Sequence, residues 1–288
     1  IILLDSYAFD NACITRLRDA LSLEGGTDHA ARIAIIDDFN REDLNADIII
    51  NYMPDAHDAH YNNADLVLAG LEYAPLRPQF ASEAAETPHP PQAVPLPLKG
   101  KVQKDAYRIL ITTGSTDPYG MRDAIRKMLE EIEVTDGTVP RSPWETGDRW
   151  DSPPVTSAPS LDIVIADGSV KDMAQLMKEC DIAVTAGGTT LLELCAFGVP
   201  AVVFAMADNQ MRQVKGLAAQ GAILYAGSVG DATRDYVTQE TEAVVKNIAE
   251  QVKRLLEDAA LRQALSSRMR ALVDGKGAER IARALANV

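Results

Sequence analysis

The sequence predicts an α/β protein with two doubly wound, parallel-sheet domains. Short β-like apolar runs alternate with helical patterns over almost the whole chain, which is typical of parallel strands joined by crossover helices. The length of 288 residues suits two domains of about 100–200 residues each. A polar stretch at 85–105 carries closely spaced prolines. Because such a run resists both helix and central strand, it is interpreted as a linker or a surface excursion, and the domain boundary is placed there.

The first domain, residues 1–84, is expected to form a parallel sheet with a helix after its first strand. Each predicted strand is a short apolar run, and the helical pattern lies between the first two runs. The strands are expected at Ile1–Leu4, Ile33–Ile36, Ile48–Ile50 and Leu66–Ala69, and the helix near Ala8–Leu23.

The second domain, residues 106–275, repeats the alternation more regularly. Its strands are expected at Arg108–Thr113, Leu161–Ala166, Asp181–Thr185, Pro200–Phe204 and Ala222–Tyr225. Its helices are expected near Gly120–Ile132, Lys171–Cys180, Thr189–Phe197, Asn209–Gln220, Glu240–Glu257 and Ala259–Val273. Residues 276–288 are assigned to a C-terminal helix, and the segment 141–160, which carries both tryptophans and several prolines, to an inserted loop.

Composition excludes several classes of partner. Lys and Arg number 28 against 42 Asp and Glu, a net charge of −14, and a negative field of this kind repels the phosphate backbone of nucleic acid. No apolar run approaches the roughly 20 residues needed to span a bilayer, so no membrane partner is expected. Cys13, Cys180 and Cys195 are far apart and odd in number, which fits a reduced cytoplasmic protein without a disulfide framework. The oligomeric state is left open.

The most informative stretch runs from Asp181 to Pro200. A buried strand ends at Ala186, Gly187 and Gly188 allow a tight turn, and the residues Thr189 and Thr190 open a helix. The free N–H groups of such a first turn suit a phosphate or diphosphate, and glycines let it approach the backbone. Glu193, about one turn further on, is placed to accept hydrogen bonds from ribose hydroxyls. Spacing alone leaves a second interpretation open, an ordinary βα turn with Glu193 as a solvated helix residue.

The wider context resembles a known family. The stretch Ala186–Glu193 is followed by Gly198-Val199-Pro200, Asn209-Gln210 and Gly221-Ala222, as in the nucleotide-sugar half of the GT-B fold. More narrowly, the chain is similar to the UDP-sugar hydrolases of pseudaminic acid biosynthesis and their spore-coat polysaccharide relatives. The stretches that agree with this family are Asp5-Ser6-Tyr7, Gly70–Arg77, Gly114–Asp117 and Asp274–Arg280. The resemblance implies two Rossmann-like domains that face each other across a cleft.

The resemblance also implies roles for individual residues. The diphosphate would meet Gly187, Gly188, Thr189 and Thr190, with Gly114, Ser115 and Thr116 on a second loop near the phosphates. Glu193 would bind the ribose and Val170 the uracil through backbone groups. Asn209 and Gln210 would hold the sugar. Tyr7 would face the sugar across the cleft, and a buried core tyrosine is the alternative interpretation. No cofactor is implied.

One departure from the family concerns the catalytic base. The family carries a Gly-x-Gly-His loop after its first strand, and its histidine activates water. The four histidines of this sequence, His29, His57, His60 and His89, stand in other contexts. By the resemblance, the first domain is therefore expected to be incomplete, with the chain beginning a few dozen residues into it.

The activity implied is hydrolysis of a UDP-activated diacetamido-trideoxy sugar, in which water attacks C1 with inversion and UDP leaves. Two alternatives stay open: a GT-B glycosyltransferase that uses an acceptor hydroxyl, and a nucleotide-sugar-binding protein without catalysis. The first domain shows no apolar or basic amphipathic pattern for a lipid acceptor, which favours water.

No metal site is expected. His57 and His60 lie in a polar stretch without an evident third ligand, and they are interpreted as solvated loop residues. Asp37 and Asp38 are a candidate Mg²⁺ pair, but a strand end with one solvated aspartate and one helix cap is the favoured interpretation.

Overall fold

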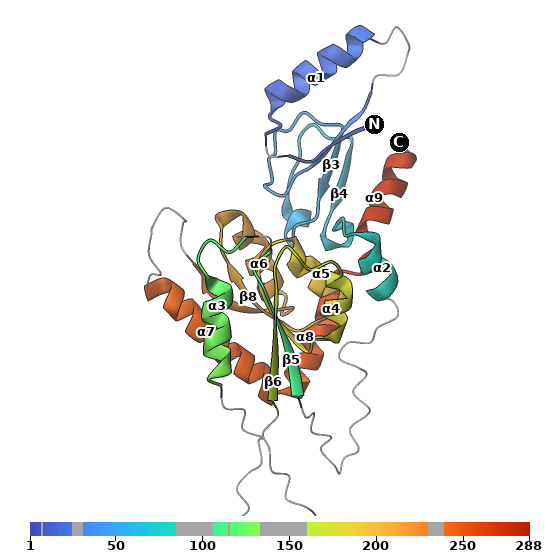
Figure 1. The fold of residues 1–288 in the computed structure, drawn as a ribbon. Helices are drawn as coiled ribbons and strands as arrows, with labels where there is room; N and C mark the ends of the chain where they lie inside the picture. Colours follow the sequence, from blue (N-terminus) through green and yellow to red (C-terminus); the bar gives the residue numbers. More distant parts are fainter. Residues whose placement is uncertain (7, 25–30, 85–105, 115, 133–159, 230–238) are drawn as a thin grey trace, which may run out of the picture.

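The computed structural model describes residues 1–6, 8–24, 31–84, 106–114, 116–132, 160–229 and 239–288. These residues form two α/β domains, each built on a parallel sheet, which lie one above the other in Figure 1. The predicted fold class is therefore confirmed. The proline-rich linker at 85–105 and the tryptophan-bearing segment up to residue 159 lie outside the described residues, so their interpretation stays a prediction.

The first sheet has four strands in sequence order. These are β1 (Ile2–Leu4), β2 (Ile33–Ile36), β3 (Ile48–Asn51) and β4 (Leu66–Ala69). Helix α1 (Asn11–Glu24) packs on one face, where Ile14 is fully buried together with Ile33 and Ile35. Helix α9 (Gly277–Ala286) returns from the end of the chain to the other face, where Ile281 packs with Ile50 and Leu68 (Figure 1).

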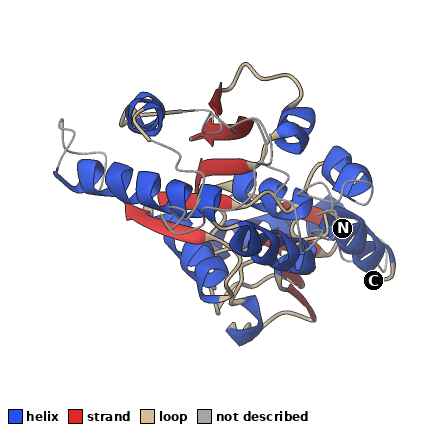
Figure 2. Cartoon of the chain, turned by 90° about the horizontal axis from the view of Figure 1, so that it is seen from below, coloured by secondary structure: helices blue, strands red, loops and turns tan. Residues whose placement is uncertain are grey.

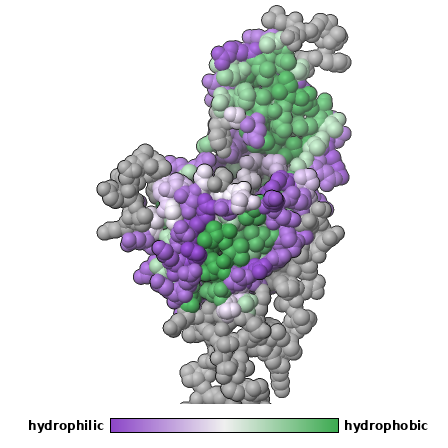
Figure 3. All heavy atoms as spheres, viewed as in Figure 1, coloured by the Kyte–Doolittle hydropathy of each residue, from purple (hydrophilic) through white to green (hydrophobic). Residues whose placement is uncertain are grey.

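Helices leave part of this first sheet uncovered. Leu3 is 48% exposed and Val67 38% exposed, although both are apolar strand residues. The two side chains lie on opposite faces of the sheet, because Leu3 shares its row with Ala34 and Val67 shares its row with Ile49. Figure 3 shows a hydrophobic surface on the upper domain. The sequence showed no apolar pattern for a lipid acceptor in the first domain, and this exposed apolar surface was not expected from it. The sequence pattern missed it because it does not show which strand faces remain without a covering helix.

The second sheet has five strands in the order β6–β5–β7–β8–β9, all parallel. Their bounds are Ala106–Thr112 for β5, Ser160–Ala166 for β6, Ile182–Ala186 for β7, Ala201–Ala205 for β8 and Leu224–Ser228 for β9. The chain moves outward from β5 to β6 and then returns to the other side of β5. The strands β5 and β7 are consequently neighbours from which the chain leads in opposite directions.

Helices cover both faces of the second sheet, as Figure 2 shows. Helices α3 (Met121–Glu130) and α7 (Gln239–Glu257) pack on one face. The other face carries α4 (Met173–Glu179), α5 (Thr189–Phe197) and α6 (Asp208–Ala219), and α8 (Ala259–Leu272) contributes side chains to both cores. None of the described helices has the length and apolar character needed to cross a membrane.

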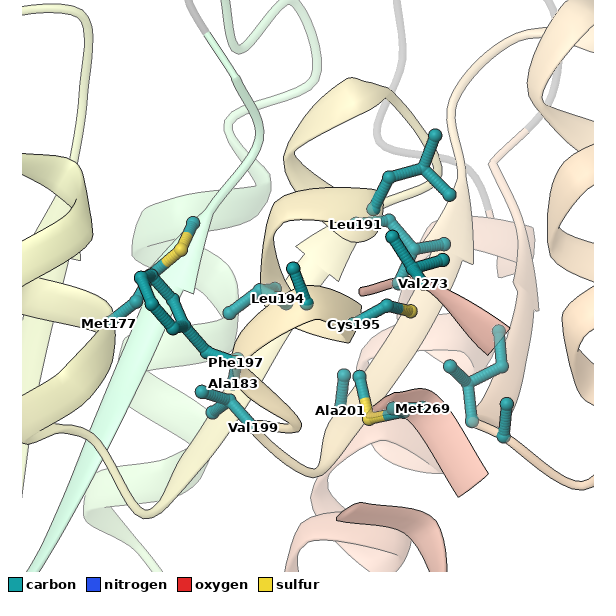
Figure 4. Close-up of a cluster of buried hydrophobic side chains, with 14 of the residues drawn as sticks. Met177, Ala183, Leu191, Leu194, Cys195, Phe197, Val199, Ala201, Met269 and Val273 are labelled. Atoms are coloured by element: carbon teal, nitrogen blue, oxygen red, sulfur yellow. The ribbon is translucent and has the colours of Figure 1, made fainter. Parts of the chain in front are cut away.

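The core around α5 is dense and apolar (Figure 4). Cys195 is fully buried there among Leu194, Phe197 and Met269, and burial raises the pKa of its thiol to about 12. Cys195 is therefore a core residue. Phe80 of α2 (Pro78–Ala84) joins the same core, with its ring 5.4 Å from that of Phe197.

Each strand and helix expected from the sequence is present, with its ends moved by at most three residues. Helix α2 and two short 3-10 turns, η1 (Ala56–Asp58) and η2 (Leu71–Tyr73), were not expected. Helix α2 packs on the second domain and α9 on the first, so elements are exchanged across the assigned domain boundaries. The exact bounds assigned to the domains remain a prediction.

Candidate functional site

The carboxyl ends of the two sheets face each other. Helix α6, which follows β8 of the second sheet, packs against the loop that follows β3 of the first. A Cβ added to Gly216 of α6 would lie 2.5 Å from Cβ of Pro54 in that loop. Parallel strands gather their βα loops at one edge, so both sets of loops are brought to this interface.

The strands β5 and β7 form the switch point of the second sheet. The helix after β5 packs on one face of the sheet and the helix after β7 on the other, so the two loops diverge. In open α/β sheets, ligands bind at such a point. Cβ atoms built on Gly114 and Gly188 in these loops would meet no atom of the described residues within 4 Å. Gly114 also has a φ of +85°, which favours glycine.

Hydrogen bonds from α6 fix the loop after β7. Gln213, which is only 5% exposed, donates from Nε2 to the carbonyl oxygens of Gly187 and Gly188, at 3.0 Å in each case. Gly187 itself is buried, and a Cβ there would lie 2.2 Å from Cγ2 of Val214. The two glycines thus have different requirements: Gly187 is needed for packing, whereas Gly188 borders open space.

Helix α5 begins directly after this loop. Gly188 is its N-cap residue in extended conformation, Thr189 is exposed and Thr190 is half-buried. The first N–H groups of an α-helix lack partners within the helix and carry the positive end of its dipole. The α5 N-terminus can therefore accept an anion at the switch point.

Glu193 lies one turn into α5 and is 7% exposed. Its Oε1 accepts hydrogen bonds from Nε of Arg77 at 3.2 Å and from Nη2 at 2.9 Å. Burial raises the pKa of the Glu193 carboxyl, and Arg77 partly opposes this shift. The interpretation of Glu193 as a solvated helix residue is therefore wrong, because the helix turns this side chain toward the segment before α2.

Asn209 and Gln210 lie in the first turn of α6, beside the glycine loop. Asn209 is exposed. Gln210 accepts a 2.8 Å hydrogen bond on Oε1 from the backbone N–H of Met206, and its Cβ lies 3.2 Å from where a Gly187 Cβ would stand. Gln210 therefore shapes the loop after β8, while Asn209 is free of this task.

The remaining loops at this edge differ from the α5 N-terminus. Asp117 accepts hydrogen bonds from the N–H groups of Met121 and Arg122, so a carboxylate already occupies the start of α3. Thr116 is exposed, and its carbonyl oxygen accepts a hydrogen bond from the hydroxyl of Thr113. Val170 is half-buried against the core, and its N–H donates to Asp167 in a turn. Among these loops, α5 offers the best anion site.

Tyr7 and Ser115 lie outside the described residues, so their predicted roles stay predictions. Within the part of the chain that the structure describes, no three His, Cys, Asp or Glu side chains come close enough to hold a metal ion. His57 lies on η1, with Nε2 3.9 Å from Oε1 of Glu72, and is mostly exposed.

The first domain reaches the site through Arg212 of α6. Its guanidinium donates to Oδ2 of Asp55 at 2.8 Å and to the carbonyl oxygen of Asp38 at 2.7 Å. It also donates to Oδ1 of Asn40 at 2.5 Å. Arg212 lies three residues after Asn209, so this bridge positions the start of α6 against the loops that follow β2 and β3.

Behind these loops lies a polar network that includes the fully buried Asp37 and Asn51. Asp37 accepts hydrogen bonds from Nε of Arg41 and from the hydroxyl of Tyr61, both at 2.8 Å. Asn51 donates to the Tyr61 hydroxyl and to Asn40. The expected helix cap at this pair is wrong, because no helix follows Asp37 within 38–55, and its carboxylate instead accepts from the backbone N–H of Arg41.

Comparison with known proteins gives the family. Residues 108–282 match the model of the glycosyltransferase family 28 C-terminal domain. The chain belongs to this family. It is also 28% identical over 186 residues to the spore coat polysaccharide biosynthesis protein SpsG of Bacillus subtilis (strain 168), which covers 62% of this chain and 50% of that protein. The chain thus spans about half the length of the curated relative it matches.

Two solved structures share the fold of the whole chain. Acinetobacter baumannii MurG superposes with a TM-score of 0.53 at 17% identity, over 93% of this chain and 68% of that one. The spinosyn rhamnosyltransferase SpnG gives a TM-score of 0.53 at 15% identity, over 99% and 72%. At this level of identity they show the fold, which is the two-domain GT-B architecture.

The family 28 domain contains the glycine loops, Glu193 and Arg212, but not the groups that they contact from the other side. Arg77, Asp55 and Asn40 precede residue 108. Sequence reasoning missed Arg77, Arg212 and Gln213 as parts of the site. The pairs Arg77–Glu193 and Arg212–Asp55 are 116 and 157 positions apart, and no local spacing signals them. Gln213 has a weak signal, since it stands three residues after Gln210 and therefore on the same helix face.

Proposed function

We propose that this family 28 protein binds a UDP-sugar at the switch point between β5 and β7, with the diphosphate on the N-terminus of α5. The observation that carries the proposal is the glycine loop, which is open at Gly188 and is fixed by hydrogen bonds that Gln213 donates to its carbonyl oxygens. With a net charge of −14, the chain would bind an anion through backbone N–H groups and the helix dipole. Thr189 and Thr190 would add hydroxyl groups, and Gly114, Ser115 and Thr116 would close the phosphate site.

The nucleoside would lie deeper along α5. Glu193 would accept hydrogen bonds from the ribose hydroxyls, and the backbone near Val170 would contact the uracil. Asn209 would bind the sugar directly, with Gln210 positioning the loop around it, and Tyr7 would approach from the first domain. The buried carboxylate, which Arg77 binds, supports this placement. Such a group is little solvated by water and can accept hydrogen bonds from a ligand.

The reaction proposed is hydrolysis of a UDP-activated diacetamido-trideoxy sugar for nonulosonic (pseudaminic) acid biosynthesis. Water would attack C1 from the face opposite the diphosphate, the C1–O bond would break, and UDP would leave with the bonding electrons. The α5 N-terminus would stabilise the charge that builds on the diphosphate. A base must take the proton from water. The sequence has no Gly-x-Gly-His loop, and the proposal assigns this role to no residue of the chain.

A glycosyltransferase is the second candidate, and one observation favours it. The hydrophobic surface that Figure 3 shows on the first domain offers a place for an apolar acceptor. Apolar residues of both edge strands are also exposed, Leu3 on one face of the sheet and Val67 on the other. The donor site would be the same, and an acceptor hydroxyl would replace water. A nucleotide-sugar-binding protein without catalysis would use the same donor site and release no UDP.

The test is phosphorus and proton NMR on a UDP-linked diacetamido sugar mixed with the protein expressed from its complete gene, without acceptor. Release of UDP together with an inverted free sugar is the expected result. An intact donor with shifted phosphate resonances contradicts hydrolysis, and release of UDP only on addition of an acceptor identifies a transferase. Unshifted phosphate resonances contradict the donor site itself. The variant Gly188→Val, which blocks the open side of the loop, is the control for binding at α5.

A further inference from the structure

The contact between Arg77 and Glu193 is asymmetric. Both donors of the guanidinium that reach the carboxylate, Nε and Nη2, bind the same oxygen, Oε1. Within the described part of the chain, Oε2 of Glu193 accepts no hydrogen bond, and it is not sealed from solvent. One oxygen is therefore fixed by the protein and the other is left for a donor that the protein itself does not supply.

Arg77 is itself held in place. Its guanidinium carbon lies 5.0 Å from the centre of the Phe80 ring, and Phe80 packs on Phe197 with the ring centres 5.4 Å apart. Arg77 and Phe80 are three positions apart on one segment, and Glu193 and Phe197 are four positions apart on α5. Arg77 and the first turn of α2 thus contact α5 at two points, one polar and one aromatic.

Burial and the ion pair with Arg77 act in opposite directions on the pKa of Glu193. Glu193 is nearly buried, and burial by itself disfavours the charged carboxylate. Arg77 opposes that effect, while 57% of its own side chain remains exposed. A purely structural ion pair would be expected to satisfy both carboxylate oxygens, because a guanidinium fork matches them in pairs. In this structure, Nε and Nη2 of Arg77 both donate to Oε1.

We propose that Arg77 is a positioning residue that turns Oε2 of Glu193 toward the ribose of a bound nucleotide and thereby sets the preference for ribonucleotides over 2′-deoxyribonucleotides. This inference rests on the proposed UDP-binding function. An acidic side chain that accepts from the 2′-hydroxyl recognises the sugar of the nucleotide only when its oxygen is correctly oriented. Lysine, a point charge on a flexible stem, would keep the charge at this position but would lose the paired hydrogen bonds that two guanidinium nitrogens donate to Oε1.

The experiment is calorimetric titration of UDP and dUDP into the wild type and the variants Arg77→Met, Arg77→Lys, Glu193→Gln and the double variant Arg77→Met/Glu193→Gln. Methionine keeps the apolar stem over Phe80 and removes the fork. Arg126→Met is the matched control, because Arg126 forms an exposed pair with Asp123 on α3, away from α5. Circular dichroism and melting temperatures establish which variants are folded.

We expect the wild type to bind UDP about tenfold or more tightly than dUDP, as for a lost hydrogen bond to a charged group. Arg77→Met should weaken UDP by about tenfold, leave dUDP nearly unchanged and bring their ratio close to one. Arg77→Lys should keep only part of the preference. The double variant should be no worse than Glu193→Gln alone, since both changes act on one contact, and Arg126→Met should match the wild type.

Other outcomes separate the two proposals. If the wild type does not bind UDP, the proposed function itself is wrong. If Glu193→Gln abolishes the preference but folded Arg77→Met and Arg77→Lys keep it, the ribose site stands and the role of Arg77 is overturned. Equal losses for UDP and dUDP in Arg77→Met, additive with Glu193→Gln, would likewise overturn it. If Arg77→Met does not fold, an unchanged ratio in folded Arg77→Lys decides against the proposal.

Discussion

The two sheets are built from the same kind of strand, yet they differ in topology and in what stands at their carboxyl edges. The described strands of the first sheet follow sequence order. In the second sheet, β6 lies on one side of β5, and β7 and the later strands lie on the other side. The first edge is filled by buried polar side chains, including Asp37 and Asn51. The second edge is open at Gly114 and Gly188.

The open edge of the second sheet lies at the point where the order of the strands changes direction. Where the loops after neighbouring strands diverge to opposite faces, they leave room between them, and backbone N–H groups are presented there. Where strands follow in order, the loops crowd the same region and side chains satisfy one another. The first domain therefore contributes orientation through the groups that accept hydrogen bonds from Arg212, and the second contributes the proposed binding groups.

The largest effect is expected at the glycine loop itself. Gly187→Val should destabilise the second domain by about 2–3 kcal/mol, because its Cβ would collide with Val214 in a filled core. Gly188→Ala should leave the free energy of unfolding unchanged, since its Cβ meets open space, but weaken UDP binding. Urea denaturation and calorimetry measure the two quantities. A Gly188→Ala protein with full affinity would contradict the binding site at α5.

The polar edge of the first sheet should be sensitive in a different way. Tyr61→Phe removes a hydrogen bond to the fully buried Asp37 and should lower stability by about 1–2 kcal/mol. Hydrogen exchange should show faster opening of β2 and β3, with β5 and β7 unchanged. Tyr225→Phe is the control in the second domain, because among the described residues its hydroxyl donates to the weak acceptor Sδ of Met211, at 3.7 Å. Equal effects of the two changes would break the contrast between the domains.

The bridge between the two regions should give a smaller change in stability. Arg212→Met removes hydrogen bonds to Asp55, Asp38 and Asn40, and because Asp55 is 45% exposed its ion pair contributes only about 0.2–1 kcal/mol. The expected result is a wider spread of distances between spin labels on the two domains. Arg283→Met, which breaks an exposed pair on α9, should leave that distribution as in the wild type.

The smallest effect is a pH dependence of UDP binding that is expected at Glu193 of the second sheet's edge. Burial raises the pKa of Glu193 and Arg77 opposes it, so the ionised acceptor is present above this pKa and is lost as the pH falls through it. UDP affinity should fall on acidification at a higher pH than an ordinary glutamate would give, and Glu193→Gln should remove this step. For stability the sign is opposite. A raised pKa contributes stability that is present at low pH and is lost as the pH rises through the folded-state pKa.

The amino-acid sequence determined the secondary structure, the fold class and the glycine loop. Strands such as Ile33–Ile36 and Leu66–Ala69 are short, apolar and bounded by polar residues, so their position follows from local pattern. The β7–α5 turn is local as well, because two adjacent glycines and a helix start fall within a few residues. Helix α2 was missed, since it is only seven residues long and begins at a proline.

The tertiary structure alone decided what Glu193 contacts, where the first domain meets α6 and which apolar residues stay exposed. Arg77 reaches Glu193 across 116 positions, and Arg212 reaches Asn40 across 172. Such pairs depend on the order of strands and on the faces that the crossover helices take. Leu3 is exposed for the same reason, because a strand pattern gives the alternation of its side chains but not the helix that covers them. The residues of the site are therefore local in sequence, and their environment is a property of the assembled fold.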